Sequence, residues 1–340
     1  MATFPLTRLP AFSVKNVLQM MSPLQLVVFS LLSKKCKDQV NSLNTSAETM
    51  RIQVTNSIVI EIPFEEGTLR IGFFELEPHM VRLMRDERNK TLRAAAKVTA
   101  GIYRNGVYRE NCQWFTNKLG VKECVEHLKF VFPNLSVDLI DFSVRAYRFS
   151  LDSIQETFPN IPQHHTGDYG FNRLILEKFL PTYSISIARN CFEDFRIPHK
   201  TIFAMSNVPN LWIEGPITNI TVNDLLINSS NRIDDQNSRI SSKEFNRFLH
   251  LWIKGANPRL ESMTIFKADR HHMDIALKGI KHQIMPRTLE RVFKYSDNSQ
   301  YVVAGVDIHR KDGTKATIGL SRSEGRSRFL MCVWYGHCIG

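Results

Sequence analysis

The chain has 340 residues, more than twice the roughly 150 of a typical single domain, so two or three domains are expected. Hydrophobic residues make up 43% of it, which supports a large core and excludes disordered, collagen-like and low-complexity classes. The 44 lysines and arginines exceed the 33 acidic residues, and the net charge of +11 raises a nucleic-acid-binding hypothesis. The six cysteines form no Cys-x-x-Cys pair and are too sparse for a disulfide-rich fold.

The N-terminal segment shows no signal-peptide pattern, because prolines and basic residues interrupt it before any apolar run. The most apolar stretch, residues 24–32, is much shorter than the about 20 residues that cross a membrane. We therefore expect a cytoplasmic or nuclear protein that does not associate with membranes.

Residues 9–43 are predicted to be helical. Pro10 suits the first turn of a helix, and Ser22-Pro23 supplies an N-cap and a first-turn proline for a second helix. The apolar positions of the first helix follow the spacing of an amphipathic stripe: Val14, Val17, Leu18 and Met21. The second helix is apolar around its whole circumference, so it must be buried on more than one face, by the rest of the chain or by a partner.

From residue 50 the apolar periodicity changes to two, which is typical of strands. Asn105-Gly106 predicts a tight antiparallel hairpin within residues 100–110. Lys311-Asp312-Gly313 predicts a second hairpin within residues 303–335.

The middle of the chain contains a loose internal repeat, in which a proline opens each short predicted strand. These prolines are spaced by roughly 22 to 28 residues, with a last gap about twice as long, near the period of leucine-rich repeats. They are Pro133, Pro159, Pro181, Pro209 and Pro258. Helical patterns occupy residues 121–132, 170–180 and 242–254 between them. The strict leucine-rich consensus is absent, so ordinary α/β connections of similar length remain an alternative.

The N-terminal residues resemble an F-box, a motif with an initial Leu-Pro, an apolar pair at the end of its first helix and a second helix started by proline. Its positions are filled by Leu9, Pro10, Val17, Leu18, Met21, Pro23, Leu26 and Phe29. Two positions depart from the pattern: Phe12 stands where an acidic residue is frequent, and Cys36 where tryptophan is frequent.

The rest of the chain is similar to the large nematode-expanded set of F-box proteins that carry a type-2 F-box-associated domain. The similarity lies in residues 50–78, 170–198, 245–258, 310–317 and 333–335. It implies an α/β chain (α+β overall), with a small three-helix F-box followed by an irregular leucine-rich-repeat-like α/β platform. We predict an F-box at 1–45, a strand-rich connection at 46–110, a repeat-like F-box-associated domain at 111–285 and a C-terminal β-hairpin segment at 286–340.

The resemblance implies a non-catalytic substrate-recognition subunit of an SCF-type E3 ubiquitin ligase. The F-box would bind a Skp-type adaptor and through it a cullin, and the eight F-box residues above are the candidate contacts, although some must pack the module internally. The F-box-associated region would bind an unidentified protein substrate. The candidates for that surface are Ser186, Arg189, Trp212, Glu214 and Thr264.

No catalytic, cofactor or metal site is predicted, because no nucleophile elbow, zinc-protease, Walker or dinucleotide motif is present. The pair His164-His165 is interpreted as solvated loop histidines. Cys332, His337 and Cys338 are metal-ligand types, but they lack a Cys-x-x-Cys partner.

The positive charge is spread along the chain, with a net +4 in residues 1–45, where the resemblance places an acidic adaptor. Such charge steers association more than it adds affinity. The alternative hypothesis is a basic nucleic-acid-binding α/β protein with no ubiquitin role. Tyr103 and Tyr108 beside Arg104 and Arg109 are its one hint in the sequence.

Overall fold

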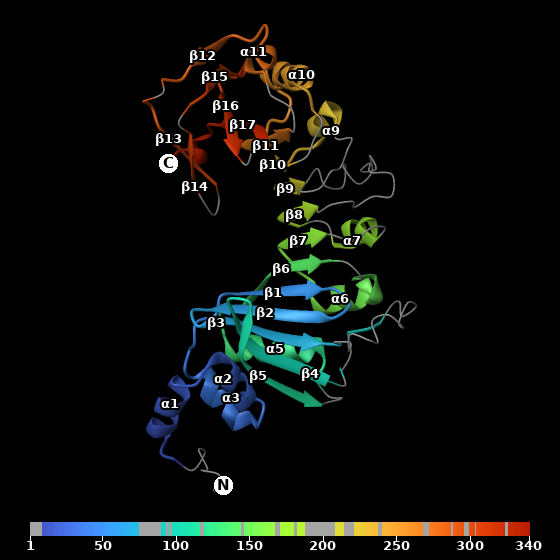
Figure 1. Ribbon diagram of the computed structural model, residues 1–340, viewed down its shortest axis with the longest axis vertical. Helices are drawn as coiled ribbons and strands as arrows, with labels where there is room; N and C mark the ends of the chain where they lie inside the picture. The colour runs from blue at the N-terminus through green and yellow to red at the C-terminus, as the bar shows by residue number, and fades with distance from the viewer. Residues whose placement is uncertain are drawn as a thin grey trace. The chain divides into compact units, whose positions relative to one another are not determined.

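A computed structural model shows two compact units, residues 1–162 and residues 163–340 (Figure 1). The predicted mixed α/β class, with N-terminal helices before a strand-rich region, is confirmed. The four predicted segment boundaries stay predictions. Among the described residues, no helix is long and apolar enough to cross a membrane. The structure describes residues 9–74, 90–92, 95, 97–115, 119–143, 146–166, 171–179, 182–187, 208–213, 221–236, 240–267, 272–286, 288–295, 299–302, 304–323 and 326–340.

The first unit begins with the three predicted helices, α1 (Ala11–Gln19), α2 (Pro23–Ser30) and α3 (Lys34–Asn41). The expected start of α2 is confirmed: the Ser22 hydroxyl accepts from the Gln25 amide, and the Gln25 side chain accepts from the Ser22 amide. These reciprocal bonds satisfy amides that the first turn of a helix leaves without partners.

The sheet of the first unit is an antiparallel meander from β1 to β5, with β6 added parallel to β1. Its strands are β1 (Thr49–Val54), β2 (Ile58–Phe64), β3 (Gly67–Phe73), β4 (Lys97–Arg104), β5 (Val107–Phe115) and β6 (Ser136–Phe142). The hairpin between β4 and β5 is confirmed. Asn105 and Gly106 both have positive φ, as the two-residue turn requires. Helical segments accompany this sheet: α5 (Val121–Val131), η2 (Ala146–Arg148) and α6 (Leu151–Thr157).

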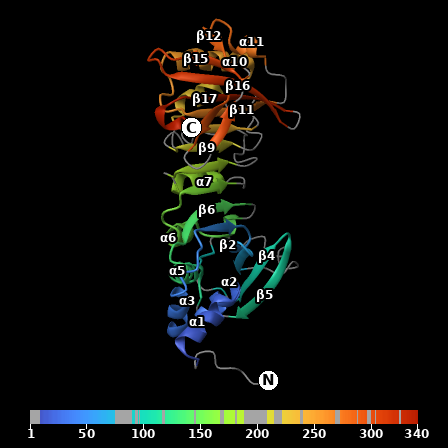
Figure 2. The same ribbon diagram turned by 90° about the vertical axis from the view of Figure 1, so that its left-hand side faces the viewer.

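The N-terminal helices pack on this unit instead of standing free. The helix α2 contacts α3, α5 and β4, and Figures 1 and 2 show α2 and α3 beside α5. Two side-chain contacts fix them: Ser22 Oγ donates to Glu110 Oε2 at 2.7 Å, and Lys37 Nζ lies 4.2 Å from the centre of the Phe130 ring. The rest of the chain therefore covers much of the all-round apolar surface of α2.

Ser30, at the end of α2, contacts His127 of α5. The Ser30 hydroxyl donates to the Val27 carbonyl at 2.7 Å, and its oxygen lies 2.7 Å from His127 Nε2. Because the hydroxyl has one proton and donates it to the Val27 carbonyl, His127 Nε2 must be the donor of the second bond.

The second unit contains five neighbouring parallel strands, followed by antiparallel strands that pair with the last of them. The parallel strands are β7 (Gln163–Thr166), β8 (Ser184–Ile187), β9 (Asn210–Ile213), β10 (Arg232–Asp235) and β11 (Ser262–Lys267). The sheet continues antiparallel through β17 (Arg326–Val333), β16 (Lys315–Ser323), β15 (Val306–His309) and β12 (His282–Ile284). A separate pair is β13 (Arg291–Lys294) with β14 (Ser299–Val302).

The repeat-like organisation is confirmed for the described strands, which start at intervals of roughly 20 to 30 residues, the leucine-rich period. The strand β10 lies between Pro209 and Pro258 and accounts for the double-length gap in the sequence. The helices between these strands are α7 (Phe171–Phe179), α9 (Val222–Ile227) and α10 (Ser242–Ile253), with α11 (Met273–Ala276) after β11. The hairpin predicted around residues 303–335 is confirmed by the antiparallel pairing of β15 with β16.

The core of the second unit lies between the helices and one face of the parallel strands. The predicted inward face of α10 is buried: Phe245, Phe248, Leu249 and Trp252. The buried residue Arg310, after β15, donates to the carbonyl oxygens of Trp252, Ala256 and Asn257 and ties the end of α10 to the antiparallel strands.

His164 differs from its prediction as a solvated loop histidine. It lies on β7 with only 3% of its surface exposed, and its ring packs edge-on against Phe179 of α7. Burial lowers the pKa of His164 to about 4, because the charged form is poorly solvated there. The strand alternation places His164 inward, a position that composition alone does not reveal.

The contact between α2 and α5 predicts a pH dependence. Burial, together with the charge of Lys37, lowers the pKa of His127 to about 4. An unfolded chain has a histidine pKa of about 6.5, so below that pH it binds a proton that the folded chain excludes. We expect the protection of α2 and α3 amides against hydrogen exchange to be constant above pH 6.5 and to fall between about pH 6.5 and pH 4. In the His127→Gln variant, which has no titrating ring, this fall should be smaller; equal falls in both proteins would contradict the assignment.

Replacing Leu26 by alanine should lower the free energy of unfolding by about 2 to 4 kcal/mol, because the buried side chain leaves a cavity among the helices. The Met20→Ala variant is the matched control. Met20 is 87% exposed, so its change should stay within about 0.5 kcal/mol. Urea denaturation of the full chain measures both values, and equal stabilities would contradict this difference in burial.

Candidate adaptor and substrate surfaces

The eight candidate F-box residues divide into buried and accessible positions. Leu18, Pro23, Leu26 and Phe29 are buried within the first unit. Pro10 and Val17 are exposed, and Leu9 and Met21 are partly exposed. The sequence could not separate these groups for α2, because apolar residues surround that helix and give no inward direction.

Several large apolar side chains that were not among the candidates are exposed on these helices or directly after them. Phe12 is 75%, Met20 87% and Leu32 70% exposed. Val28 in α2 and Leu31, the C-cap residue of that helix, are exposed to a smaller degree. Exposed apolar groups gathered in one short segment are typical of an interaction surface.

A hollow of about 550 Å³ lies between these helices and the sheet of the first unit. Four of the candidates line one side of it: Leu18, Met21, Pro23 and Leu26. Leu43, residues 45–49 and residues 63–66 are also part of its lining. Leu18 and Leu26, which have almost no exposed surface, therefore border an open space as well as the interior.

The described substrate candidates lie in one row across the parallel sheet. Ser186 on β8 pairs with Trp212 on β9, and Trp212 pairs through Asp234 of β10 with Thr264 of β11. Arg189 and Glu214, the two other candidates, lie outside the described residues. Side chains alternate along each strand, and the residues flanking this row belong to the core. Ser186, Trp212 and Thr264 are therefore on the face opposite the core, and all three are partly exposed.

Arg232 is a residue of this face that the sequence analysis missed. Its guanidinium lies 4.3 Å from the centre of the Trp212 ring and 4.2 Å from the centre of the Tyr295 ring. A cation between two aromatic rings is held in place by both, so the indole of Trp212 has a fixed support. Trp212 and Arg232 are 20 residues apart in the chain but lie on neighbouring strands, β9 and β10. The strand register brings them together.

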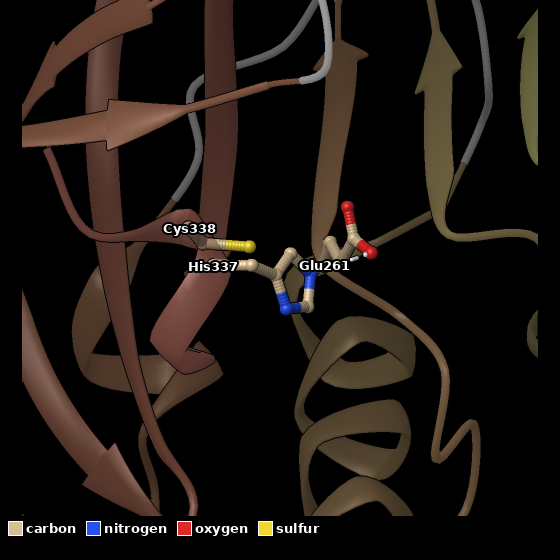
Figure 3. A group of neighbouring side chains, drawn as sticks. All are labelled: Glu261, His337 and Cys338. Atoms are coloured by element: carbon tan, nitrogen blue, oxygen red, sulfur yellow. Dashed lines mark hydrogen bonds and ion pairs between the residues drawn. The ribbon is translucent and has the colours of Figure 1, made fainter.

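Of the three potential metal ligands noted near the C-terminus, the structure brings two together with a third residue. His337 and Cys338, in η3 (Gly336–Cys338), lie beside Glu261, which directly precedes β11 (Figure 3). The potential ligand atoms of these three residues lie within 4.8 Å of one another, and His337 Nε2 is 3.0 Å from Glu261 Oε1. Cys332 is buried nearby and is not part of this group. No local pattern could have identified Glu261, which is 76 residues from His337 in the chain.

Comparisons with known proteins agree with the resemblance drawn from the sequence. Residues 6–46 match the family model of the F-box domain, and residues 201–265 match that of an F-box associated domain. The chain is 22% identical over 322 residues to the F-box associated domain-containing protein sdz-33 of Caenorhabditis elegans, covering 93% of each protein. It is also 22% identical over 349 residues to an uncharacterized C. elegans protein, F59B2.9, covering 98% of this chain and 79% of that protein.

No solved structure matches this chain significantly. The two domain matches lie on different units: the F-box match covers α1 to α3, and the F-box associated match includes β9, β10 and most of β11. The two matches show an F-box followed by an F-box-associated domain, which agrees with the resemblance to nematode-type F-box proteins.

Proposed function

We propose that this protein is a non-catalytic substrate receptor of an SCF-type E3 ubiquitin ligase. The observation that carries the proposal is that the segment matching an F-box, although packed on the first unit, keeps Phe12 of α1, Met20 after α1 and Leu32 after α2 largely exposed. Exposed apolar side chains that are concentrated in the segment matching an F-box are typical of a surface that a partner covers. The partner that an F-box implies is a Skp-type adaptor, and through it a cullin.

The adaptor contacts come from the accessible positions of these helices. We assign them to Leu9, Pro10, Val17 and Met21, joined by the exposed residues above. Leu18, Pro23, Leu26 and Phe29 contribute mainly by holding the helices in place, since they are buried in the chain itself. The exposed lysines of the segment, Lys15, Lys34 and Lys35, would steer an acidic adaptor toward this face.

The second unit would present the substrate. The row of Ser186, Trp212 and Thr264 lies on a rigid sheet face, and aromatic side chains with arginine neighbours are frequent energetic centres of interfaces. The ligase would then hold the substrate near the ubiquitin-carrying enzyme, so the rate gain comes from proximity and needs no chemistry from this chain. Such a receptor would act in the cytoplasm, in the nucleus or in both.

The adaptor surface predicts a specific loss of binding. Phe12→Ser, Met20→Ser and Leu32→Ser together should reduce recovery of the adaptor and cullin with the full chain by more than about tenfold, because they remove three exposed apolar contacts. Val107→Ser is the matched control, since Val107 is a 56% exposed apolar residue elsewhere in the first unit. Co-purification measures recovery, and circular dichroism checks that each variant is folded. Normal recovery with the folded triple variant would refute this adaptor surface.

The nucleic-acid-binding alternative is tested on the same preparations. In the structure the Tyr103 ring packs against Tyr108 at 5.3 Å between centres, and the Arg70 guanidinium lies 5.0 Å from the Tyr103 ring. If the wild-type chain recovers no adaptor but retains RNA in a salt-sensitive manner, the receptor proposal is wrong and the alternative holds.

The substrate surface is tested by proximity labelling in cells. A chain that cannot bind the adaptor retains its substrates without degrading them, so it is the background for the comparison. Adding Trp212→Ala and Thr264→Ala should remove a defined set of labelled proteins, whereas Tyr301→Ala, which changes a 62% exposed aromatic residue of β14, should keep that set. An unchanged set of labelled proteins with Trp212→Ala and Thr264→Ala would exclude this sheet face as the substrate site.

A further inference from the structure

The group formed by Glu261, His337 and Cys338 combines three different ligand chemistries at one place in the second unit. It offers a carboxylate oxygen, an imidazole nitrogen and a thiol sulfur within 4.8 Å of one another. Figure 3 shows the Cys338 sulfur and the Glu261 carboxylate on either side of the His337 ring. Cys338 is fully buried and His337 is exposed, so the group runs from the interior to the surface.

Surrounding contacts support the Glu261 carboxylate and the His337 ring. Asn231 Nδ2 donates to Glu261 Oε1 at 2.6 Å, and the backbone amide of Val333 donates to the Glu261 carbonyl at 2.7 Å. The Tyr335 ring stacks on the His337 ring with 5.8 Å between their centres. Tyr335 is itself anchored, because its hydroxyl donates to the Pro258 carbonyl at 2.6 Å. Outer contacts that orient potential ligands in this way are typical of metal sites.

The thiolate form of Cys338 is unfavourable beside the Glu261 carboxylate unless a cation lies between them. Burial and the negative charge of Glu261 raise the pKa of the Cys338 thiol to about 11. The same two groups would both be favourable ligands of a divalent ion, whose charge stabilises the thiolate.

We propose that Glu261, His337 and Cys338 bind one Zn²⁺ ion, with water at the fourth position. Zinc accepts sulfur, nitrogen and oxygen ligands together, whereas Mg²⁺ and Ca²⁺ prefer oxygen alone. Metal–ligand distances of about 2.0 to 2.3 Å in a tetrahedron place the ligand atoms roughly 3.3 to 3.5 Å apart. The imidazole of His337 is exposed and can rotate to close the remaining distance.

Zinc binding at neutral pH would release one proton per ion. The thiolate is the form of cysteine that binds metals, so the Cys338 thiol must lose its proton to become a ligand. His337 would bind through a ring nitrogen and Glu261 through a carboxylate oxygen. The ion would tie the turn that contains η3 to the segment that enters β11, two parts of the second unit that are far apart in the chain.

The site is tested by zinc titration of the purified full chain, starting from metal-free protein. We expect one Zn²⁺ per chain, about one proton released per ion, and with Co²⁺ the charge-transfer absorption of a thiolate ligand. Cys338→Ser should abolish that absorption, and His337→Ala and Glu261→Gln should each weaken zinc binding by more than about tenfold. His337 is 66% exposed, so its variant should remain folded.

Two control variants keep the test specific. His309→Ala removes an exposed histidine of β15, and Cys112→Ser removes a partly exposed thiol of the first unit; both should bind zinc as the wild type does. Zinc binding that survives in Cys338→Ser and His337→Ala, or that Cys112→Ser or His309→Ala abolishes, would overturn the assignment. The absence of any zinc binding to the folded wild-type chain would overturn it as well.

Discussion

The helix α2 imposes the constraint on which the first unit depends. Its eight residues are apolar around nearly the whole circumference, so no single neighbour can cover them. Three elements, α3, α5 and β4, pack against α2, and Ser22 and Ser30 make polar contacts at its two ends. The F-box helices therefore pack against the sheet that follows them. The surface left for a partner is the part of the helices that these neighbours do not cover.

A second constraint, the alternation of side chains along parallel strands, organises the other unit. Buried aliphatic residues such as Ile185 and Ile233 face the helices, which forces Ser186, Trp212 and Thr264 to the opposite side. The register then fixes which of these residues are neighbours. A shift of one residue in register would exchange the two faces. The register therefore determines both which residues form the core and which form the outer surface.

Local signals in the sequence predicted local structure well. The Ser22-Pro23 start of α2 and the Asn105-Gly106 turn were predictable because the residues that decide them are adjacent in the chain. Features that depend on distant segments were not predictable. The strand β10 lacks the opening proline of its neighbours, and the burial of individual residues in α2 depends on helices and strands up to about a hundred residues away. The meeting of Glu261 with His337 has no signature in either segment.

The proposed receptor role depends on binding alone and so needs fixed side chains, and the second unit supplies them through buried polar contacts. Asp307 accepts two hydrogen bonds from Arg291, at 2.8 and 2.9 Å, and a third from Thr317, which lowers the pKa of its carboxyl despite burial. Arg310 similarly satisfies three carbonyl oxygens near the end of α10. Arg232 supports the Trp212 ring through a cation–π contact, so a partner need not order that side chain on binding. Because side-chain ordering opposes association, a preorganised indole is a stronger contact than a mobile one of equal area.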